Sequence, residues 1–245
     1  MPSDTDDTTL IWLRPEPSGR KPRYTRAEIA RTALSIADTE GFGAVTMKRI
    51  AAGLGAGTMT LYYYVRNKAD IVALMQDTIF EGVLVPAGEL PSGWRAAVTL
   101  IARRTRDALV AHPWAISSLN QAQFGPNAMR HYEQSLAALA ATGLSYPQKT
   151  EVTAILDDYV AGNASHAIEA QERLRIASGN PSLVTEAMAY GEALIATGEF
   201  PELTALAEQA RRTGGQIGPL EHLDRQFETG LAALLDGIEQ HYGIP

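Results

Sequence analysis

The sequence predicts an all-α protein, in which a small N-terminal domain built on a helix-turn-helix precedes a larger helical domain. Three observations support this fold class. Apolar residues recur at helical spacing, no sustained period-2 alternation and no Asn-Gly or Asp-Gly hairpin is found, and glycine or proline separates the helical segments. The 245 residues are enough for two such parts. We expect a flexible arm over residues 1–22, the helix-turn-helix domain over 23–69 and the helical domain over 70–245.

Composition places the chain among ordinary globular proteins, since hydrophobic residues make up 45% and charged residues 20%. No run approaches the roughly 20 apolar residues that a membrane-spanning helix needs. The start, Met-Pro-Ser-Asp-Thr-Asp-Asp, is acidic and unlike a signal peptide. We therefore expect a cytoplasmic protein with no membrane partner. The absence of cysteine excludes disulfides and thiolate metal sites.

Charge is unevenly distributed along the chain. The net charge of −7 would by itself argue against a nucleic-acid partner, but residues 14–68 carry +6, residues 1–13 carry −3 and residues 69–245 carry −10. A basic segment on an acidic body is typical of a small DNA-binding domain attached to a larger domain. Chance clustering of basic residues is the alternative.

The basic segment contains three predicted helices and the start of a fourth. Thr25 and Glu28 form a capping box at the start of the first helix, which Gly41 ends. Thr46 caps the second helix, and Asn67 caps the fourth. The third predicted helix lies between the second and the fourth, is short and polar, and carries three consecutive tyrosines.

The second and third helices are joined by Leu-Gly-Ala-Gly (54–57), and this sharp reversal requires glycine. Together they form a helix-turn-helix, a motif whose second helix enters the major groove of DNA. The third helix has little apolar face to bury but carries threonine and tyrosine hydroxyls, which can bond to bases or phosphates. The motif therefore predicts DNA binding.

A longer pattern over residues 25–79 resembles the TetR family of transcriptional regulators. It consists of Gly-Phe at the end of the first helix (41–42), Ile-Ala-Ala-Gly-Leu-Gly-Ala-Gly (50–57) and Leu-Tyr-Tyr-Tyr-Val-Arg-Asn-Lys (61–68). The family's usual form of the last piece is Leu-Tyr-x-His-Phe-x-x-Lys, which this chain matches at its leucine, first tyrosine and lysine. It departs at the third tyrosine, at the valine, and at Gly57, where a serine cap is usual. The resemblance implies a one-component repressor that a small molecule releases from DNA.

The resemblance also implies three groups of DNA-binding residues. Phosphates would be contacted by Thr46, Tyr62 and Lys68. Bases or the adjacent backbone would be contacted by Thr58, Thr60 and Tyr63. The flanking minor groove would be reached by a basic run, Arg20, Lys21 and Arg23. The remaining tyrosine of the run, Tyr64, is expected to pack against the first helix.

The larger domain is predicted to consist of longer helices. Their expected bounds are 94–112, 126–142, 147–178, 183–197, 202–212 and 220–242.

An enzyme and a scaffold protein without DNA binding are the two alternative classes of function. Asp157 and Asp158 are adjacent carboxylates, but neighbours on a helix point about 100° apart and would not converge on one bond. The five histidines show no i,i+4 pairing, so we expect no metal site, no cofactor and no enzyme. A helical scaffold that binds no DNA is the second alternative, against which the basic segment argues.

The last helix carries a near-heptad apolar stripe that predicts a homodimer. In TetR-like proteins the last helix and the long helix before it pair with their copies in a four-helix bundle. The expected interface residues are Ala161, Gly162, Phe227, Leu231, Leu234 and Ile238. The alternative is that the stripe packs inside its own subunit. A dimer would place two recognition helices about 34 to 36 Å apart on a palindromic operator in double-stranded DNA.

A pocket for a small, largely apolar effector is predicted in the middle helices. Tyr159, Asn163 and His166 lie at i, i+4 and i+7 and share one helix face, and we expect a cavity of several hundred Å³ around them. The full predicted set is Trp94, Trp114, Phe124, Met129, Tyr132, Tyr159, Asn163 and His166. Each of these residues taken singly could also belong to the plain core or to the dimer interface.

Overall fold

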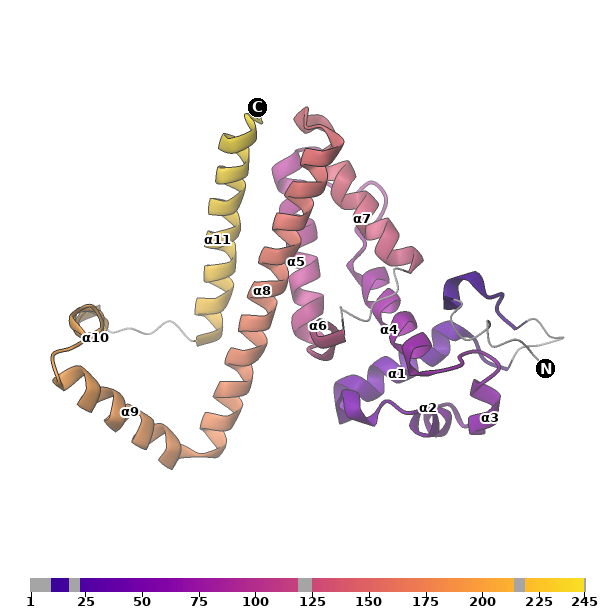
Figure 1. Ribbon diagram of the computed structural model, residues 1–245, viewed down its shortest axis with the longest axis horizontal. Coiled ribbons are helices and arrows are strands. Elements are labelled where there is room, and N and C mark those ends of the chain that lie inside the picture. The colour runs from indigo at the N-terminus through magenta and orange to yellow at the C-terminus, as the bar shows by residue number, and fades with distance from the viewer. Residues whose placement is uncertain (1–9, 18–22, 119–124, 214–218, 245) are drawn as a thin grey trace. The chain divides into compact units, whose positions relative to one another are not determined.

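The computed structural model describes residues 10–17, 23–118, 125–213 and 219–244 (Figure 1). Its described residues contain helices and turns but no β-strand, which confirms the predicted all-α fold. The chain divides into two compact units, residues 1–164 together with 237–245, and residues 165–236.

Residues 26–83 of the first unit form four helices in the predicted order, with a 3₁₀ turn between the first and the second. These are α1 (Arg26–Glu40), η2 (Phe42–Ala44), α2 (Met47–Leu54), α3 (Thr58–Leu61) and α4 (Lys68–Val83). The Thr25 and Glu28 capping box is present, and Asn67 caps α4 by accepting a hydrogen bond from the backbone of Asp70. Gly55 ends α2 in the left-handed region, which glycine enters without a steric cost.

Burial of one apolar side of each short helix fixes the helix-turn-helix. Ile29 of α1, Ile50 of α2 and Leu61 of α3 are all fully buried, and α1 packs against both α2 and α4. Tyr64 is buried as expected, and its hydroxyl accepts a hydrogen bond from the backbone N–H of Tyr24 at 3.4 Å. The hydroxyl of Tyr24 in turn donates to the Leu54 carbonyl at the end of α2.

The segment Leu10–Pro17 packs against these helices, so this part of the expected flexible arm has a fixed place. It contains the 3₁₀ turn η1 (Ile11–Leu13), in which Ile11 is fully buried. The guanidinium of Arg26 donates to the carbonyls of Ile11 and Arg14, and Arg14 forms an ion pair with Asp70 of α4. These bonds join residues far apart in the sequence, so no local pattern in this segment indicated them.

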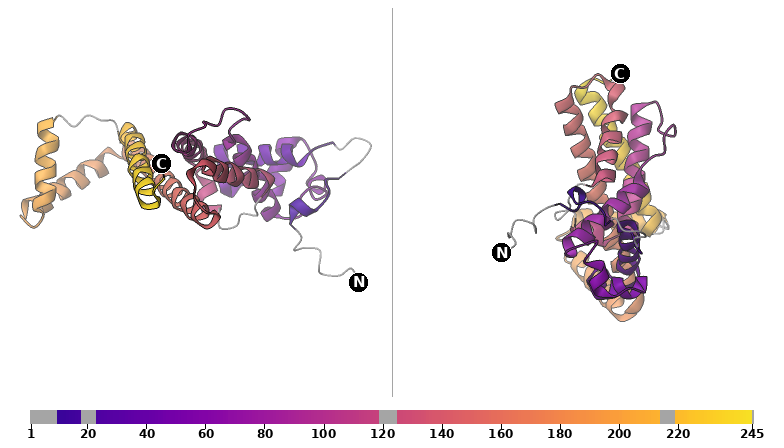
Figure 2. Two further views of the ribbon diagram at one scale, coloured as in Figure 1. Left: turned by 90° about the horizontal axis from the view of Figure 1, so that it is seen from above. Right: turned by 90° about the vertical axis from the view of Figure 1, so that its right-hand side faces the viewer.

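The remainder of the first unit is a layer of helices beside α4. It comprises α5 (Trp94–Ala111), α6 (Trp114–Ser118), α7 (Pro126–Ala138), η4 (Ala140–Thr142) and the first part of α8 (Tyr146–Gly179). α4 packs against α5 and α7, and α5 packs against α7 (Figures 1 and 2). The expected boundary between residues 69 and 70 falls inside α4, so one continuous helix belongs both to the helix-turn-helix and to this layer.

The second unit continues along α8 and contains α9 (Pro181–Ala196), α10 (Pro201–Thr213) and most of α11 (Pro219–Tyr242). α9 and α10 meet at a corner (Figure 2). Although α9 is rich in apolar residues, none of its residues is buried in the single chain. In the described part of the chain, no helix is both long and apolar enough to cross a membrane.

Candidate DNA-binding surface and ligand cavity

The recognition segment, defined here as residues 58–64, comprises α3 and the turn after it, and it presents aromatic and hydroxyl side chains to solvent. Tyr63 is 78% exposed and Tyr62 is 48% exposed, whereas Thr58 and Thr60 are partly exposed at the start of the segment. Leu61 and Tyr64 of the same segment are buried and join it to the core of the head. Met59 is also 75% exposed, although it is not among the residues predicted to contact DNA.

Two of the expected phosphate contacts stand at helix starts. Thr46 is exposed and caps α2, with its hydroxyl accepting a hydrogen bond from the Arg49 backbone at 3.1 Å. Lys68 is the first residue of α4, and its ammonium lies 4.6 Å from the centre of the Phe42 ring. Lys68 is exposed, so its ammonium stays accessible to a phosphate while the ring attracts it.

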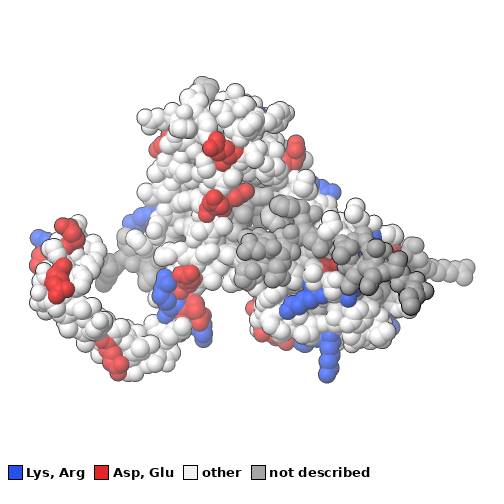
Figure 3. Space-filling view, viewed as in Figure 1, with Lys and Arg blue, Asp and Glu red and all other residues white. Residues whose placement is uncertain are grey.

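The basic run before α1 is described only at its end. Arg20 and Lys21 lie outside the described residues, whereas Arg23 is exposed, with its guanidinium 5.6 Å from the Tyr24 ring centre. Lys and Arg side chains project from the surface of the head, defined here as residues 23–69, on the side that carries α1 and α2 (Figure 3).

An apolar cavity of about 200 Å³ lies between α4, α5, α6, α7 and α8, and it is called here the α4–α8 cavity. Its larger apolar and aromatic lining residues are Ile79, Phe80, Val83, Leu109, Tyr132 and Val160. Its polar lining residues are Gln76, Thr105, His131 and Asp157. The volume is below the roughly 300 to 1,000 Å³ of typical ligand pockets and below our expectation.

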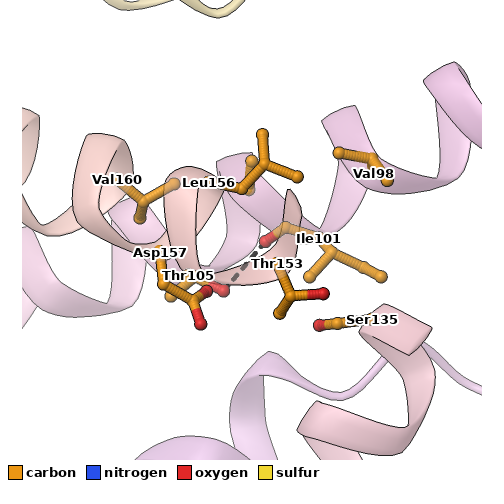
Figure 4. A pocket seen from close by; sticks show the side chains of 9 residues that line it. Val98, Ile101, Thr105, Ser135, Thr153, Leu156, Asp157 and Val160 are labelled. Carbon is orange, nitrogen blue, oxygen red and sulfur yellow. Dashed lines mark hydrogen bonds between the residues drawn. The ribbon is translucent and has the colours of Figure 1, made fainter. Parts of the chain in front are cut away.

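A smaller recess of about 20 Å³ shares part of this lining. Thr105, Asp157 and Val160 belong to both spaces, and the recess is completed by residues of α5, α7 and α8 (Figure 4). Such a volume holds about one water molecule or one small polar group.

Of the predicted ligand-binding residues, the structure places only Tyr132 on the α4–α8 cavity among those that it describes. Met129 is 56% exposed and His166 is also exposed, while Phe124 lies outside the described residues. Trp94 and Tyr159 are half-buried but line neither space.

The predicted α8 residues Tyr159, Asn163 and His166 lie on the face of the helix next to the one that lines the α4–α8 cavity. Asn163 does not line the cavity; its side-chain oxygen accepts a hydrogen bond from Arg106 Nε at 2.8 Å. The side chains of α8 that reach the cavity are Asp157, Val160 and Ala161. Ala161, expected at a dimer interface, is therefore a cavity residue. The sequence signal for Asp157 is a carboxylate directly after Leu156, which belongs with Val160 to the buried stripe of α8.

Two titratable groups in the cavity wall have shifted pKa values. Burial lowers the pKa of His131 to about 4, so its ring is neutral at pH 7, and its Nε2 lies 3.0 Å from the Thr105 hydroxyl. Burial also raises the pKa of Asp157 to about 6, and the neighbouring charge of Asp158 adds to this effect. Asp157 is surrounded by protein atoms yet keeps accessible surface, which we attribute to its place on the cavity wall.

Trp114 belongs to a contact between the helix-turn-helix and the cavity wall. It is buried, its ring stacks on Phe42 with centroids 5.5 Å apart, and its Nε1 donates to Asp38 of α1 at 3.0 Å. His112 Nδ1 lies 2.9 Å from the same carboxylate. Trp114, which was predicted to line the ligand pocket, does not line the α4–α8 cavity. The next residue, Ala115, does.

The residues expected at the dimer interface differ in how far the single chain buries them. Phe227, Leu231 and Ile238 are buried within the single chain, which favours the alternative that their stripe packs inside its own subunit. Leu234 is half-buried, and Gly162 is exposed with open space beside its Cα. The described residues contain no group of three or more side chains suited to hold a metal ion.

A helix-turn-helix with exposed polar residues, joined through α4 to a helical domain with an apolar cavity, defines a one-component transcriptional regulator. Comparison with known families identifies it further. The family described as "Bacterial regulatory proteins, tetR family" matches residues 29–75, and "Tetracyclin repressor-like, C-terminal domain" matches residues 87–242. The chain belongs to the TetR family and is a DNA-binding transcriptional regulator rather than an enzyme.

Individual relatives agree with this assignment. The chain is 34% identical to the HTH-type transcriptional repressor DrrR1 of Streptomyces coeruleorubidus, over 94% of this chain and 83% of that protein. It is 32% identical to an HTH-type transcriptional regulator of Saccharopolyspora erythraea, over 96% and 93% of the two chains. Among solved structures, ActR of Streptomyces coelicolor in complex with actinorhodin is 29% identical, with a TM-score of 0.69 and coverage of 88% and 95%.

Proposed function

We propose that the protein is a homodimeric repressor that binds a palindromic operator and leaves it when a small, largely apolar molecule enters the α4–α8 cavity. The observation that carries this proposal is that α4 serves both sites. Lys68 begins α4 beside the recognition segment, and Gln76, Ile79 and Phe80 of the same helix line the cavity. A ligand that moves α4 would therefore move the head.

DNA binding is assigned to the exposed residues of the head. Tyr62 and Lys68, with Thr46, are proposed to contact phosphates, whereas Thr60 and Tyr63 are proposed to reach base edges. Thr58 is also proposed to reach base edges. Arg23 and the basic run to which it belongs are proposed to reach the minor groove. The proposed domain bounds are 23–69 for the head and 70–245 for the ligand and dimer domain.

Release follows from linkage. If the ligand favours a head position that does not fit the operator, ligand and DNA weaken each other's binding by the same factor. The stack of Trp114 on Phe42 supports a second connection, because Phe42 also contacts Lys68 and Ala115 lines the cavity. ActR, which is similar to this chain, has been solved with actinorhodin bound, which supports a small-molecule effector here.

Self-association is proposed to use surfaces that the single chain leaves exposed. Gly162 on α8 permits close approach, and α9 exposes several large apolar side chains, including Leu183, Met188 and Tyr190. Contiguous exposed apolar surface is typical of an interface. Because the proposed target is bacterial chromosomal DNA, the proposal also places the protein in the cytoplasm.

The test is a mobility-shift titration of the purified protein on DNA from around its own gene. Affinity should fall steeply with salt, because each phosphate that the protein neutralises releases a counterion. Lys68→Ala should weaken binding to all sequences alike, whereas Thr60→Ala should change the preference at particular base pairs in a random-site selection. Lys149→Ala, which removes the same charge from α8, is the control and should bind as the wild type does. Salt-independent binding, or no enriched palindrome, would contradict the proposal.

A further inference from the structure

The recess beside the α4–α8 cavity contains a hydroxyl without a partner. Thr153 of α8 is 3% exposed, and its Oγ1 accepts and donates no hydrogen bond among the described residues. A buried hydroxyl left unbonded costs roughly 1 to 3 kcal/mol. In Figure 4 the Thr153 side chain lies among the residues that line the recess, with Asp157 on the next turn of the same helix. The hydroxyl is therefore available to a group that enters the recess.

Asp157 adds an unneutralised negative charge to the same place. Its carboxyl has no ion-pair or hydrogen-bond partner in the part of the chain that the structure describes, and the charge that acts on it is that of Asp158. Asp157 keeps accessible surface, so a ligand that covers it withdraws the carboxylate from water, and a cation at the covering end offsets the cost of that desolvation. The other polar groups at this point are already engaged, since Thr105 donates to the Ile101 carbonyl and lies 3.0 Å from His131 Nε2.

The volumes of the recess and of the α4–α8 cavity suit two different parts of one ligand. The recess of about 20 Å³ matches a single ammonium group, whereas the adjoining cavity of about 200 Å³ has an apolar lining with Phe80 and Tyr132. Because Asp157 and Thr105 line both spaces, a ligand can occupy both at once. An ammonium group carries three donors and no acceptor, which matches a carboxylate and a free hydroxyl oxygen.

We propose that the effector is an amine, whose protonated nitrogen occupies the recess between Thr153 and Asp157 while its apolar, partly aromatic body fills the α4–α8 cavity. This inference rests on the proposed function, because it names the chemical class of the molecule that the regulator senses. It also narrows our expectation of a largely apolar effector by adding one positive charge at a defined end.

Three probes of matched shape test the proposal. These are 1-naphthylmethylamine, 1-naphthylmethanol and 1-naphthoic acid, which share one aromatic body and differ in having a positive, neutral or negative head. Binding to the full-length protein is measured by calorimetry at pH 7.5. The amine should bind about tenfold or more tightly than the alcohol, as expected for a hydrogen bond to a charged group, and the acid should bind most weakly.

Three variants locate the effect. Asp157→Asn should remove the preference for the amine, and Thr153→Val should reduce amine affinity about fivefold or more while leaving the alcohol nearly unchanged. Asp158→Asn makes the same charge change one residue along an exposed part of α8 and should keep the preference. Circular dichroism confirms folding, which Asp157→Asn does not threaten because it removes an unneutralised charge.

The inference is overturned if the acid binds as tightly as the amine, if Asp157→Asn keeps the preference, if Asp158→Asn loses it equally, or if the amine does not bind at millimolar concentration. Operator binding is measured in parallel by mobility shift. If the amine binds through Asp157 but does not release DNA, the ligand class stands and the release mechanism fails. If the protein binds no operator at all, the proposed function fails independently of the calorimetry.

Discussion

At the scale of single residues, the cavity wall contains two titratable groups, whose protonation at acidic pH has opposite effects on the free energy of unfolding. His131 has its pKa lowered from 6.5 to about 4 by burial, so folding disfavours its protonated form. Asp157 has its pKa raised from 3.8 to about 6, so folding disfavours its charged form. As the pH falls, His131 therefore reduces the free energy of unfolding between about 6.5 and 4, whereas Asp157 increases it between about 6 and 3.8.

The contribution of His131 can be isolated by substitution. At about 1.4 kcal/mol per pKa unit, the wild type should lose roughly 2 to 3 kcal/mol more than His131→Gln between pH 7.5 and pH 4.5. Urea unfolding of both proteins at the two pH values measures this difference. The exposed His166 provides the matched control, and His166→Gln should follow the wild type. Equal losses for the wild type and His131→Gln would show that His131 is protonated in the folded protein.

At the scale of elements, local signals predicted helix bounds well. Capping side chains act within three residues, so the starts of α1, α2 and α4 followed from Thr25, Thr46 and Asn67. The long helix expected over 147–178 is α8, Tyr146–Gly179. Periodicity states which residues share a face but not what that face meets, and therefore the prediction could not tell which face of α8 lines the cavity.

The N-terminal segment shows the same limit, because the bonds that hold it come from a distant residue. Arg26 donates to the carbonyls of Ile11 and Arg14, and its Nε donates to the carbonyl of Tyr64 at 3.2 Å. No local pattern in residues 10–17 encodes these contacts. Burial of Ile11 and the ion pair of Arg14 with Asp70 then join the segment to the head and α4.

Arg26→Met should detach this segment, since it keeps the length and apolar stem of the side chain but removes every donor. Each lost hydrogen bond costs about 0.5 to 1.5 kcal/mol, so we expect a fall of about 1 to 3 kcal/mol in the free energy of unfolding. Hydrogen exchange of the amides of residues 10–17 should accelerate in this variant. Arg31→Met on the exposed side of α1 is the control. Unchanged exchange in Arg26→Met would mean that apolar packing alone holds the segment.

At the scale of the whole molecule, two sets of apolar residues have different roles. Phe227 and Leu231 are about 1% exposed in the single chain, so they contribute to its own stability. α9 is the opposite case, because Met188 is 63% and Tyr190 is 67% exposed, although both are large and apolar or aromatic. Burial of a large side chain contributes roughly 1.5 to 3 kcal/mol, and this contribution is absent for α9 in a monomer. A second copy of the chain is the partner that the proposed operator symmetry requires.

The two sets should therefore respond differently to substitution. Phe227→Ala should reduce the free energy of unfolding by about 3 to 5 kcal/mol, because it leaves a cavity in the core of the chain. Met188→Glu should leave the helical circular dichroism of each subunit intact but convert dimers to monomers in sedimentation at micromolar concentration, since burying an unpaired charge in an interface is costly. Thr185→Glu adds the same charge at a polar position of α9 and should remain dimeric. A folded wild-type monomer at this concentration would refute the dimer, and a dimer that persists in Met188→Glu would place the interface elsewhere than on α9.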